Sequence, residues 1–183
     1  MSSIRLLLLS CIFTACTACQ QLMPKAVGLE NATWQQQAYQ RQDQVDVQWH
    51  GKSFSFLLYQ QQQGQVLELI ALSLTGQQLF QVEYNGQHIQ VKQRIEQMRL
   101  LPFEFLIRDI LLATYPDFAQ QQAMIHPELI QDQIYAAGGE IYIQKKLVLK
   151  IQYLSKDKME LENVQVPYQM TFSPIENTLQ SNE

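Results

Sequence analysis

The sequence predicts a mainly β fold with one or more helices, in which a curved antiparallel sheet forms an incomplete β-barrel closed by a helical insertion. Apolar and polar residues alternate along most of the chain, which is typical of strands with one buried face. Turn signals recur roughly every ten to thirteen residues, as in an antiparallel meander. One segment, residues 103–115, has the pattern of a helix instead. Two closely packed sheets would bury the same residues, so both architectures stay open at this level.

The first group of strands precedes this helix. They are expected at residues 45–49, 54–58, 66–74, 79–84 and 89–91. Gly51 and Thr75-Gly76 lie at turns between them. Asn85-Gly86 is the strongest hairpin signal in the chain, because both residues tolerate the positive φ angles that a tight two-residue turn requires. The regular spacing predicts that these strands pair in sequence order.

The expected helix begins at Pro102 and ends before Pro116. Proline suits the first helical turn, and Glu104 there can pair with Arg108 one turn later. Asp109 and Glu104 lie on a shoulder that we expect to be a solvated face. Apolar residues cover more than one stripe of this helix, so it should be covered on most sides. It can fill the mouth of the sheet or line a lipid-sized cavity there.

Strands return after the helix. They are expected at residues 133–136, 141–143, 147–153, 159–161 and 164–172. Gly138-Gly139 is expected to form a hairpin turn. Pro167 has no amide hydrogen, so the last strand should be an edge strand or bulged. The half-barrel domain then covers residues 44–173, and residues 174–183 form a polar tail.

The N-terminus has the features of a bacterial lipoprotein leader, expected over residues 1–18. Arg5 precedes an apolar run of about ten residues, too short to span a bilayer. Phe13-Thr14-Ala15-Cys16 fits a lipobox, and Cys16-Thr17-Ala18-Cys19 fits less well because a cysteine takes its apolar position. We expect acylation of Cys16 or Cys19, with Cys16 preferred, and anchoring by palmitate-like chains. Residues 19–43 then form a tether, with a short helix over residues 32–41 as an option.

Lipoprotein sorting in bacteria with two membranes depends on the residue after the acylated cysteine, where aspartate favours retention in the inner membrane. Thr17 or Gln20 takes that position here. The resemblance to this class therefore implies a lipid-anchored protein on the periplasmic face of the outer membrane. Its first partner is membrane lipid.

Composition argues against several functions. The chain has 13 basic and 17 acidic residues, whereas nucleic-acid binders cluster basic residues. His50, His88 and His126 are far apart and every cysteine lies within the first nineteen residues, so no metal site is expected. Neither GxSxG nor a phosphate-binding loop occurs. We therefore expect no enzyme activity and no cofactor.

The apolar residues predict a binding cavity instead, because small-molecule sites are concave and mostly apolar. Methionines at 98, 159 and 170 would suit a deformable pocket. The residues expected to bound the cavity are Phe54, Phe56, Leu69, Phe80, Phe103, Ile107 and Ile110.

The order of elements resembles the LolA/LolB family of lipoprotein carriers and acceptors. The resemblance covers residues 45–116, with weaker agreement to residue 172. It depends on the strands at 54–59, 66–74 and 79–84, on Asn85-Gly86, and on Leu100-Leu101-Pro102 leading into the helix. The chain also resembles short LolB-like lipoproteins, some encoded beside aryl polyene biosynthesis genes.

This resemblance implies a half-barrel with a helical lid and a cavity for acyl chains of a lipid, lipoprotein or polyene lipid. LolB has an exposed, membrane-inserting leucine immediately before the glycine of one turn. Here Thr75 precedes Gly76, so either Leu74 serves through a shifted turn or the insertion function is missing. We expect an acyl-chain carrier, which would work with a periplasmic carrier protein. The alternative is an accessory envelope lipoprotein whose core is filled by side chains.

Overall fold

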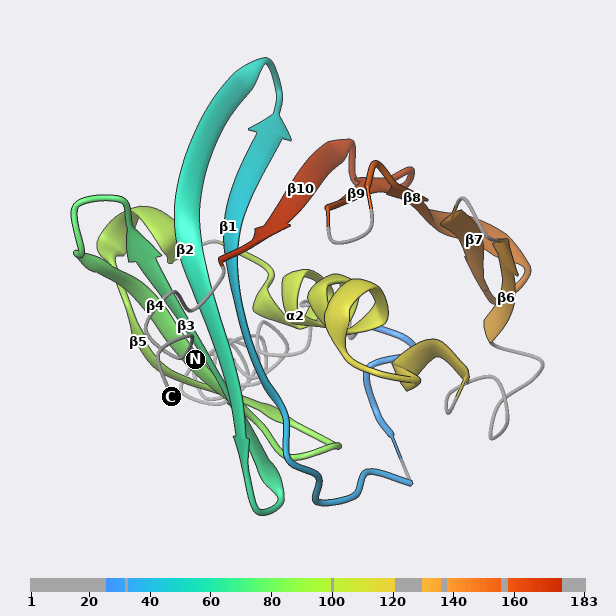
Figure 1. Ribbon diagram of the computed structural model, residues 1–183, viewed down its shortest axis with the longest axis horizontal. Helices are drawn as coiled ribbons and strands as arrows, with labels where there is room; N and C mark the ends of the chain where they lie inside the picture. Colours follow the sequence, from blue (N-terminus) through green and yellow to red (C-terminus); the bar gives the residue numbers. More distant parts are fainter. Residues whose placement is uncertain are drawn as a thin grey trace, which may run out of the picture.

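The computed structural model describes residues 26–31, 33–99, 101–120, 130–135, 138–155 and 158–175. The expected signal peptide, the candidate acylation sites Cys16 and Cys19, and most of the polar tail lie outside the described residues. Within them, ten strands form one antiparallel sheet around the helix α2 (Figure 1). The predicted fold class is confirmed, because the sheet is single, curved and open, as in an incomplete barrel.

The strands form two groups on either side of the helix. The first group is β1 (Gln40–Trp49), β2 (Lys52–Gln63), β3 (Val66–Ser73), β4 (Gln78–Tyr84) and β5 (Ile89–Arg94). A short 3-10 helix, η2 (Glu96–Met98), and α2 (Phe103–Thr114) follow. The second group is β6 (Ile130–Tyr135), β7 (Gly138–Ile143), β8 (Lys146–Tyr153), β9 (Met159–Asn163) and β10 (Tyr168–Pro174).

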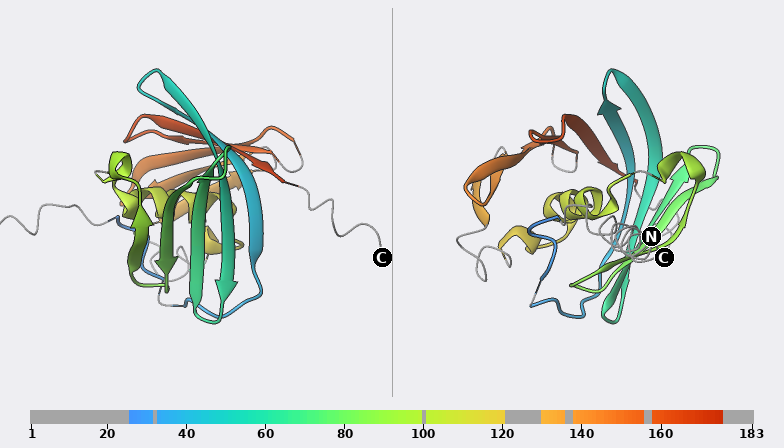
Figure 2. Two further views of the ribbon diagram at one scale, coloured as in Figure 1. Left: turned by 90° about the vertical axis from the view of Figure 1, so that its left-hand side faces the viewer. Right: turned by 180° about the vertical axis from the view of Figure 1, so that it is seen from behind.

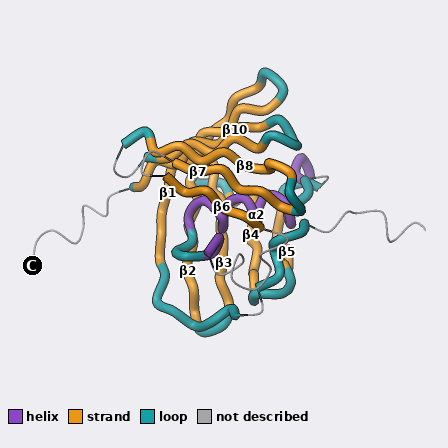
Figure 3. Tube along the Cα trace, turned by 90° about the vertical axis from the view of Figure 1, so that its right-hand side faces the viewer, coloured by secondary structure: helices purple, strands orange, loops and turns teal. Residues whose placement is uncertain are grey.

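Each group is a meander, and the two meanders meet where β1 pairs with β10. The order across the sheet is β5-β4-β3-β2-β1-β10-β9-β8-β7-β6, which leaves β5 and β6 at its edges. The second meander arches over α2 while the first stands beside it (Figure 2). Figure 3, viewed from the side of β6 and β7, shows α2 enclosed behind these strands. The helix therefore occupies the concave side of the sheet.

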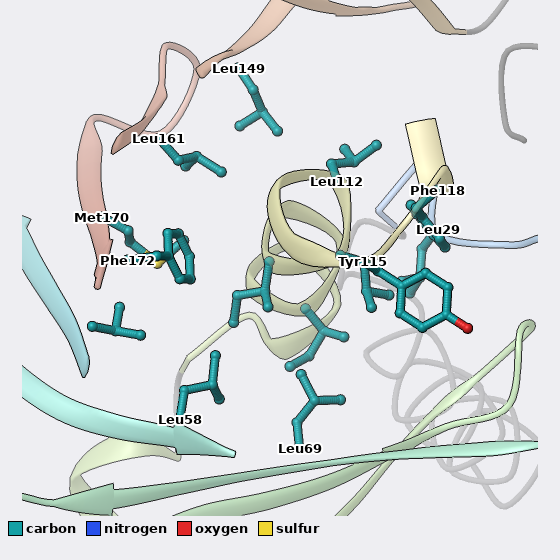
Figure 4. Close-up of a cluster of buried hydrophobic side chains, with 14 of the residues drawn as sticks. Leu29, Leu58, Leu69, Leu112, Tyr115, Phe118, Leu149, Leu161, Met170 and Phe172 are labelled. Atoms are coloured by element: carbon teal, nitrogen blue, oxygen red, sulfur yellow. The ribbon is translucent and has the colours of Figure 1, made fainter. Parts of the chain in front are cut away.

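Side chains alternate between the two faces of the sheet, as the period of two requires. Val45 and Val47 of β1 are buried, and so are Phe56 and Leu58 of β2, while their neighbours are more exposed. The buried side chains surround α2 from both meanders (Figure 4). On the helix, the side chains of Ile107, Ile110 and Leu111 are 0% exposed. One core thus holds both meanders and the helix together.

The residues before β1 run beside α2. Glu104 of the helix accepts a hydrogen bond from the amide of Ala26 at 3.1 Å. Tyr84 on β4 donates its hydroxyl hydrogen to the carbonyl oxygen of Leu29 at 2.5 Å. Trp34 packs against Gly86, where a Cβ atom would lie only 2.4 Å from the Trp34 Cβ. A side chain at position 86 would therefore displace Trp34 from its place.

The prediction for the last strand was wrong. Residues 164–167 form the turn between β9 and β10, and Pro167 lies in this turn rather than in a strand. The side-chain oxygen of Asn163 accepts hydrogen bonds from the amides of Gln165 and Val166 at 2.9 and 2.8 Å, which stabilises the turn. Strand β10 pairs with β1 and β9, so it is a central strand and not an edge.

Two further local predictions were wrong. Residues 33–39 contain no helix, and residues 40 and 41 already belong to β1. Trp34 and Tyr39 instead pack their rings against the ring of Tyr115. Gly138 and Gly139 open β7 instead of forming a turn, and Gly139 pairs with residues on both neighbouring strands.

Leu161→Ala should lower the free energy of unfolding by about 2–5 kcal/mol, because Leu161 is 0% exposed and the truncation leaves a cavity in the shared core. Leu154→Ala is the matched control, since Leu154 is 47% exposed and should cost less than about 0.5 kcal/mol. Urea denaturation measures both values. Equal losses for the two variants would contradict a core shared by β9 and α2.

Candidate functional site

An apolar pocket opens at one end of the half-barrel, where β1, β2, β4 and β10 meet the start of α2. Its cavity volume is about 90 Å³, and its exposed surface is entirely apolar. Trp49 and Phe54 are 40% and 42% exposed, so two aromatic side chains border its mouth. The lining residues are Val47, Trp49, Phe54, Phe56, Phe80, Met98, Leu101, Pro102, Phe105, Leu106, Val166, Tyr168 and Met170. We call this set the apolar pocket.

Some of the residues predicted to bound a cavity line the apolar pocket, and others do not. Phe54, Phe56 and Phe80 line the apolar pocket. Phe103 lies beneath it, with its ring 5.2 Å from that of Phe80. Leu69, Ile107 and Ile110 do not line it. Their side chains are 0% exposed, because α2 packs directly onto the strands there and fills the space.

Several lining residues were missed. Two of the three methionines predicted for a deformable pocket, Met98 and Met170, do line it. Phe105 and Leu106 also line it, and neither was among the residues expected to bound the cavity. Their role depends on how far α2 extends toward the open end of the sheet, which no local pattern encodes.

A buried polar network holds α2 beside the pocket. The Asp109 carboxylate is 0% exposed and accepts hydrogen bonds from Arg108 Nε at 2.7 Å and Asn163 Nδ2 at 2.6 Å. The Tyr168 hydroxyl donates to the same carboxylate. Arg108 also donates to the carbonyl oxygen of Val27 at 3.3 Å. The prediction of a solvated helix shoulder is therefore wrong for Asp109, and Arg108 pairs with Asp109.

Burial determines the protonation of this network. Desolvation raises the pKa of the Asp109 carboxyl, whereas the Arg108 charge and the donors Tyr168 and Asn163 act in the opposite direction. Burial and the neighbouring carboxylate also raise the pKa of Tyr168, so its hydroxyl keeps its proton and donates it. The Tyr168 ring, which lines the apolar pocket, is thereby fixed to α2 through its hydroxyl.

A polar groove lies next to the apolar pocket, between the β1–β2 and β9–β10 hairpins. Its volume is about 410 Å³, and it shares Trp49 and Tyr168 with the pocket. These two residues face each other at the end of the β1–β10 pairing. The groove is lined by Gln48, Trp49, His50, Gly51, Lys52, Ser53, Glu162, Asn163, Val164, Pro167, Tyr168 and Gln169.

Leu74 lies in the turn between β3 and β4 and is 60% exposed. The turn is fixed by hydrogen bonds, in which the Gly76 amide donates to the Ser73 carbonyl at 2.9 Å and the Gln77 amide to the Ser73 hydroxyl at 3.0 Å. Gly76 has φ 85°, which suits glycine. The hydrogen-bonded turn thus exposes a leucine side chain to solvent.

Of the three histidines, His50 lies in the polar groove and His88 at the β4–β5 turn, while His126 is outside the described residues. Among the described residues, no group of histidine, cysteine, aspartate and glutamate side chains could hold a metal ion. None of the helices described here is long and apolar enough to cross a membrane.

Asp109→Asn should lower the free energy of unfolding by about 3–5 kcal/mol, because it leaves the Arg108 charge buried without a counter-ion. Glu96→Gln is the control, since Glu96 pairs with Arg99 in an exposed ion pair that should contribute less than about 1 kcal/mol. Both are measured by urea denaturation at neutral pH. A loss below 1 kcal/mol for Asp109→Asn would contradict the network.

A family model described as "Protein of unknown function (DUF3261)" matches residues 40–176. This segment begins with β1, ends just after β10, and contains every residue of the apolar pocket and the polar groove. The chain therefore belongs to the DUF3261 family. No curated protein matches it.

Proposed function

We propose that this DUF3261 protein is an outer-membrane lipoprotein on the periplasmic side that binds the end of an acyl chain in its apolar pocket. The observation that carries the proposal is a concave pocket with wholly apolar surface, bordered by two exposed aromatic side chains. Such sites typically bind small apolar ligands. The cargo would be a lipid, a lipoprotein or a polyene lipid.

The volume limits how much of the ligand is bound. Ligand pockets usually hold about 300–1,000 Å³, whereas this cavity is about 90 Å³. In the described conformation it therefore accepts a chain terminus rather than a whole chain. A longer segment needs Leu101 and the first turn of α2 to move outward.

Leu74 supports contact with a bilayer. It is the most exposed large apolar side chain among the described residues, and its turn is rigidly hydrogen-bonded. An exposed leucine of this kind gains free energy when it enters hydrocarbon. The proposal gives Leu74 the role of a membrane-insertion residue beside the acyl anchor.

The alternative function is an accessory envelope lipoprotein that carries no lipid. Close packing favours it, because the side chains of Leu69, Ile107 and Ile110 are 0% exposed and do not line the apolar pocket. The two functions differ in whether the apolar pocket is occupied in membranes.

Photo-crosslinking of the membrane-anchored protein with a diazirine fatty acid tests occupancy. Labels mapped by mass spectrometry should fall on the pocket residues, and Met98→Trp should remove most of them by filling the cavity. Gln97→Trp is the matched control, because Gln97 belongs to the same 3-10 helix but is exposed and does not line the pocket. Equal labelling of the two variants would favour the accessory function.

The anchor is tested separately by metabolic labelling with an alkyne analogue of palmitate. Cys16→Ser should abolish labelling and release the protein from membranes, because several acyl chains are needed for stable attachment. Cys19→Ser should leave both unchanged. The reverse pattern would place the anchor at Cys19, and labelling of the double variant would refute acylation at either residue.

A further inference from the structure

We infer that the polar groove binds the anionic head group of the ligand whose chain enters the apolar pocket. This inference rests on the proposed function and adds the ligand class, an amphiphile with a carboxylate or phosphate head. It starts from the position of the groove, because Trp49 and Tyr168 form a wall of both sites.

The two sites are continuous at the point where the sheet separates. Trp49 and Tyr168 are the last pair of the β1–β10 register. Beyond them the chain turns away in two directions, at His50-Gly51 and at residues 164–167. A ligand chain between the two rings would therefore bring its head group into the groove.

The wall between the sites is held in place. The Tyr168 hydroxyl is bound to the buried Asp109, and Asn163 donates to the same carboxylate. Asn163 also accepts hydrogen bonds from two amides of the adjacent turn. The groove is thus bordered by a fixed ring on one side and a fixed turn on the other.

Lys52 gives the groove a basic side chain next to the apolar pocket. Lys52 pairs with Trp49 in the β1–β2 register, so its side chain lies on the same face as the Trp49 ring. No carboxylate of the described residues lies within ion-pair distance of Lys52. His50 also lines the groove, and the centre of its imidazole ring lies 5.1 Å from that of the Trp49 ring.

One acidic residue, Glu162, also lines the groove. Glu162 lies directly opposite Lys150 in the β8–β9 register. Opposite charges in such positions attract one another. Among the described residues Lys52 takes part in no ion pair, and it lies on the face of Trp49, so the anionic head group would give it a counter-ion.

The test compares diazirine probes with the same alkyl chain and different heads: a fatty acid, an alkyl phosphate, a fatty alcohol and a fatty amine. Each is crosslinked to the full membrane-anchored protein, and pocket labelling is divided by labelling of bulk lipid. Both anionic probes should label about fivefold more than the alcohol, the size expected for one partly exposed charge pair. A diazirine phosphatidic acid then distinguishes a phospholipid from a free fatty acid as the source.

Lys52→Gln should reduce the anion preference to about one, and Lys52→Glu should reverse it toward the amine. Lys92→Gln is the matched control, because Lys92 of β5 pairs with Glu83 of β4 and does not line the groove. If Lys52→Gln keeps the preference while the alcohol still labels the pocket, the head-group site is refuted and the apolar pocket stands. Absence of pocket labelling by every probe refutes the proposed function itself.

Discussion

The buried carboxylate of Asp109 determines how the helix sits in the sheet. An ionised group with 0% exposure is tolerated only when it is paired and fully hydrogen-bonded. Its partners come from three places: Arg108 beside it on α2, Asn163 at the end of β9 and Tyr168 at the start of β10. Because a misplaced helix would leave this charge without partners, the network fixes α2 relative to the second meander.

The C-terminal end of α2 is fixed to the first meander. Gln60 of β2 donates to the Thr114 hydroxyl at 3.1 Å, and Tyr39 donates to the Thr114 carbonyl at 3.2 Å. Burial raises the pKa of Tyr39 to about 12, so this hydroxyl remains a donor at physiological pH. The helix thus connects both meanders through polar contacts at different points along its length. The β1–β10 pairing is consequently supported from inside the concave face.

The sequence predicted the elements well where a local period or a turn residue marks them. Alternation located most of the strands, and Pro102 and Pro116 marked the limits of the helix. It failed at residues 164–167, because Val164 and Val166 continue the alternation through a turn that only Asn163 and Pro167 reveal. The burial of Asp109 was missed for a different reason. Its partners lie 54 and 59 residues away in the chain, and only the folded sheet brings them together.

The same long-range geometry explains why the pocket is smaller than the cavity predicted from the sequence. Side chains such as Ile107 and Ile110 were expected to border space, but the depth of α2 in the sheet makes them part of the filled core. The apolar pocket lies at the start of the helix, where Pro102 provides no side-chain cap. The contacts that secure this first turn are the Glu104–Ala26 hydrogen bond and the packing of Phe103 on Phe80. An acyl chain longer than the cavity has to displace these contacts, while the Asp109 network beneath can stay intact.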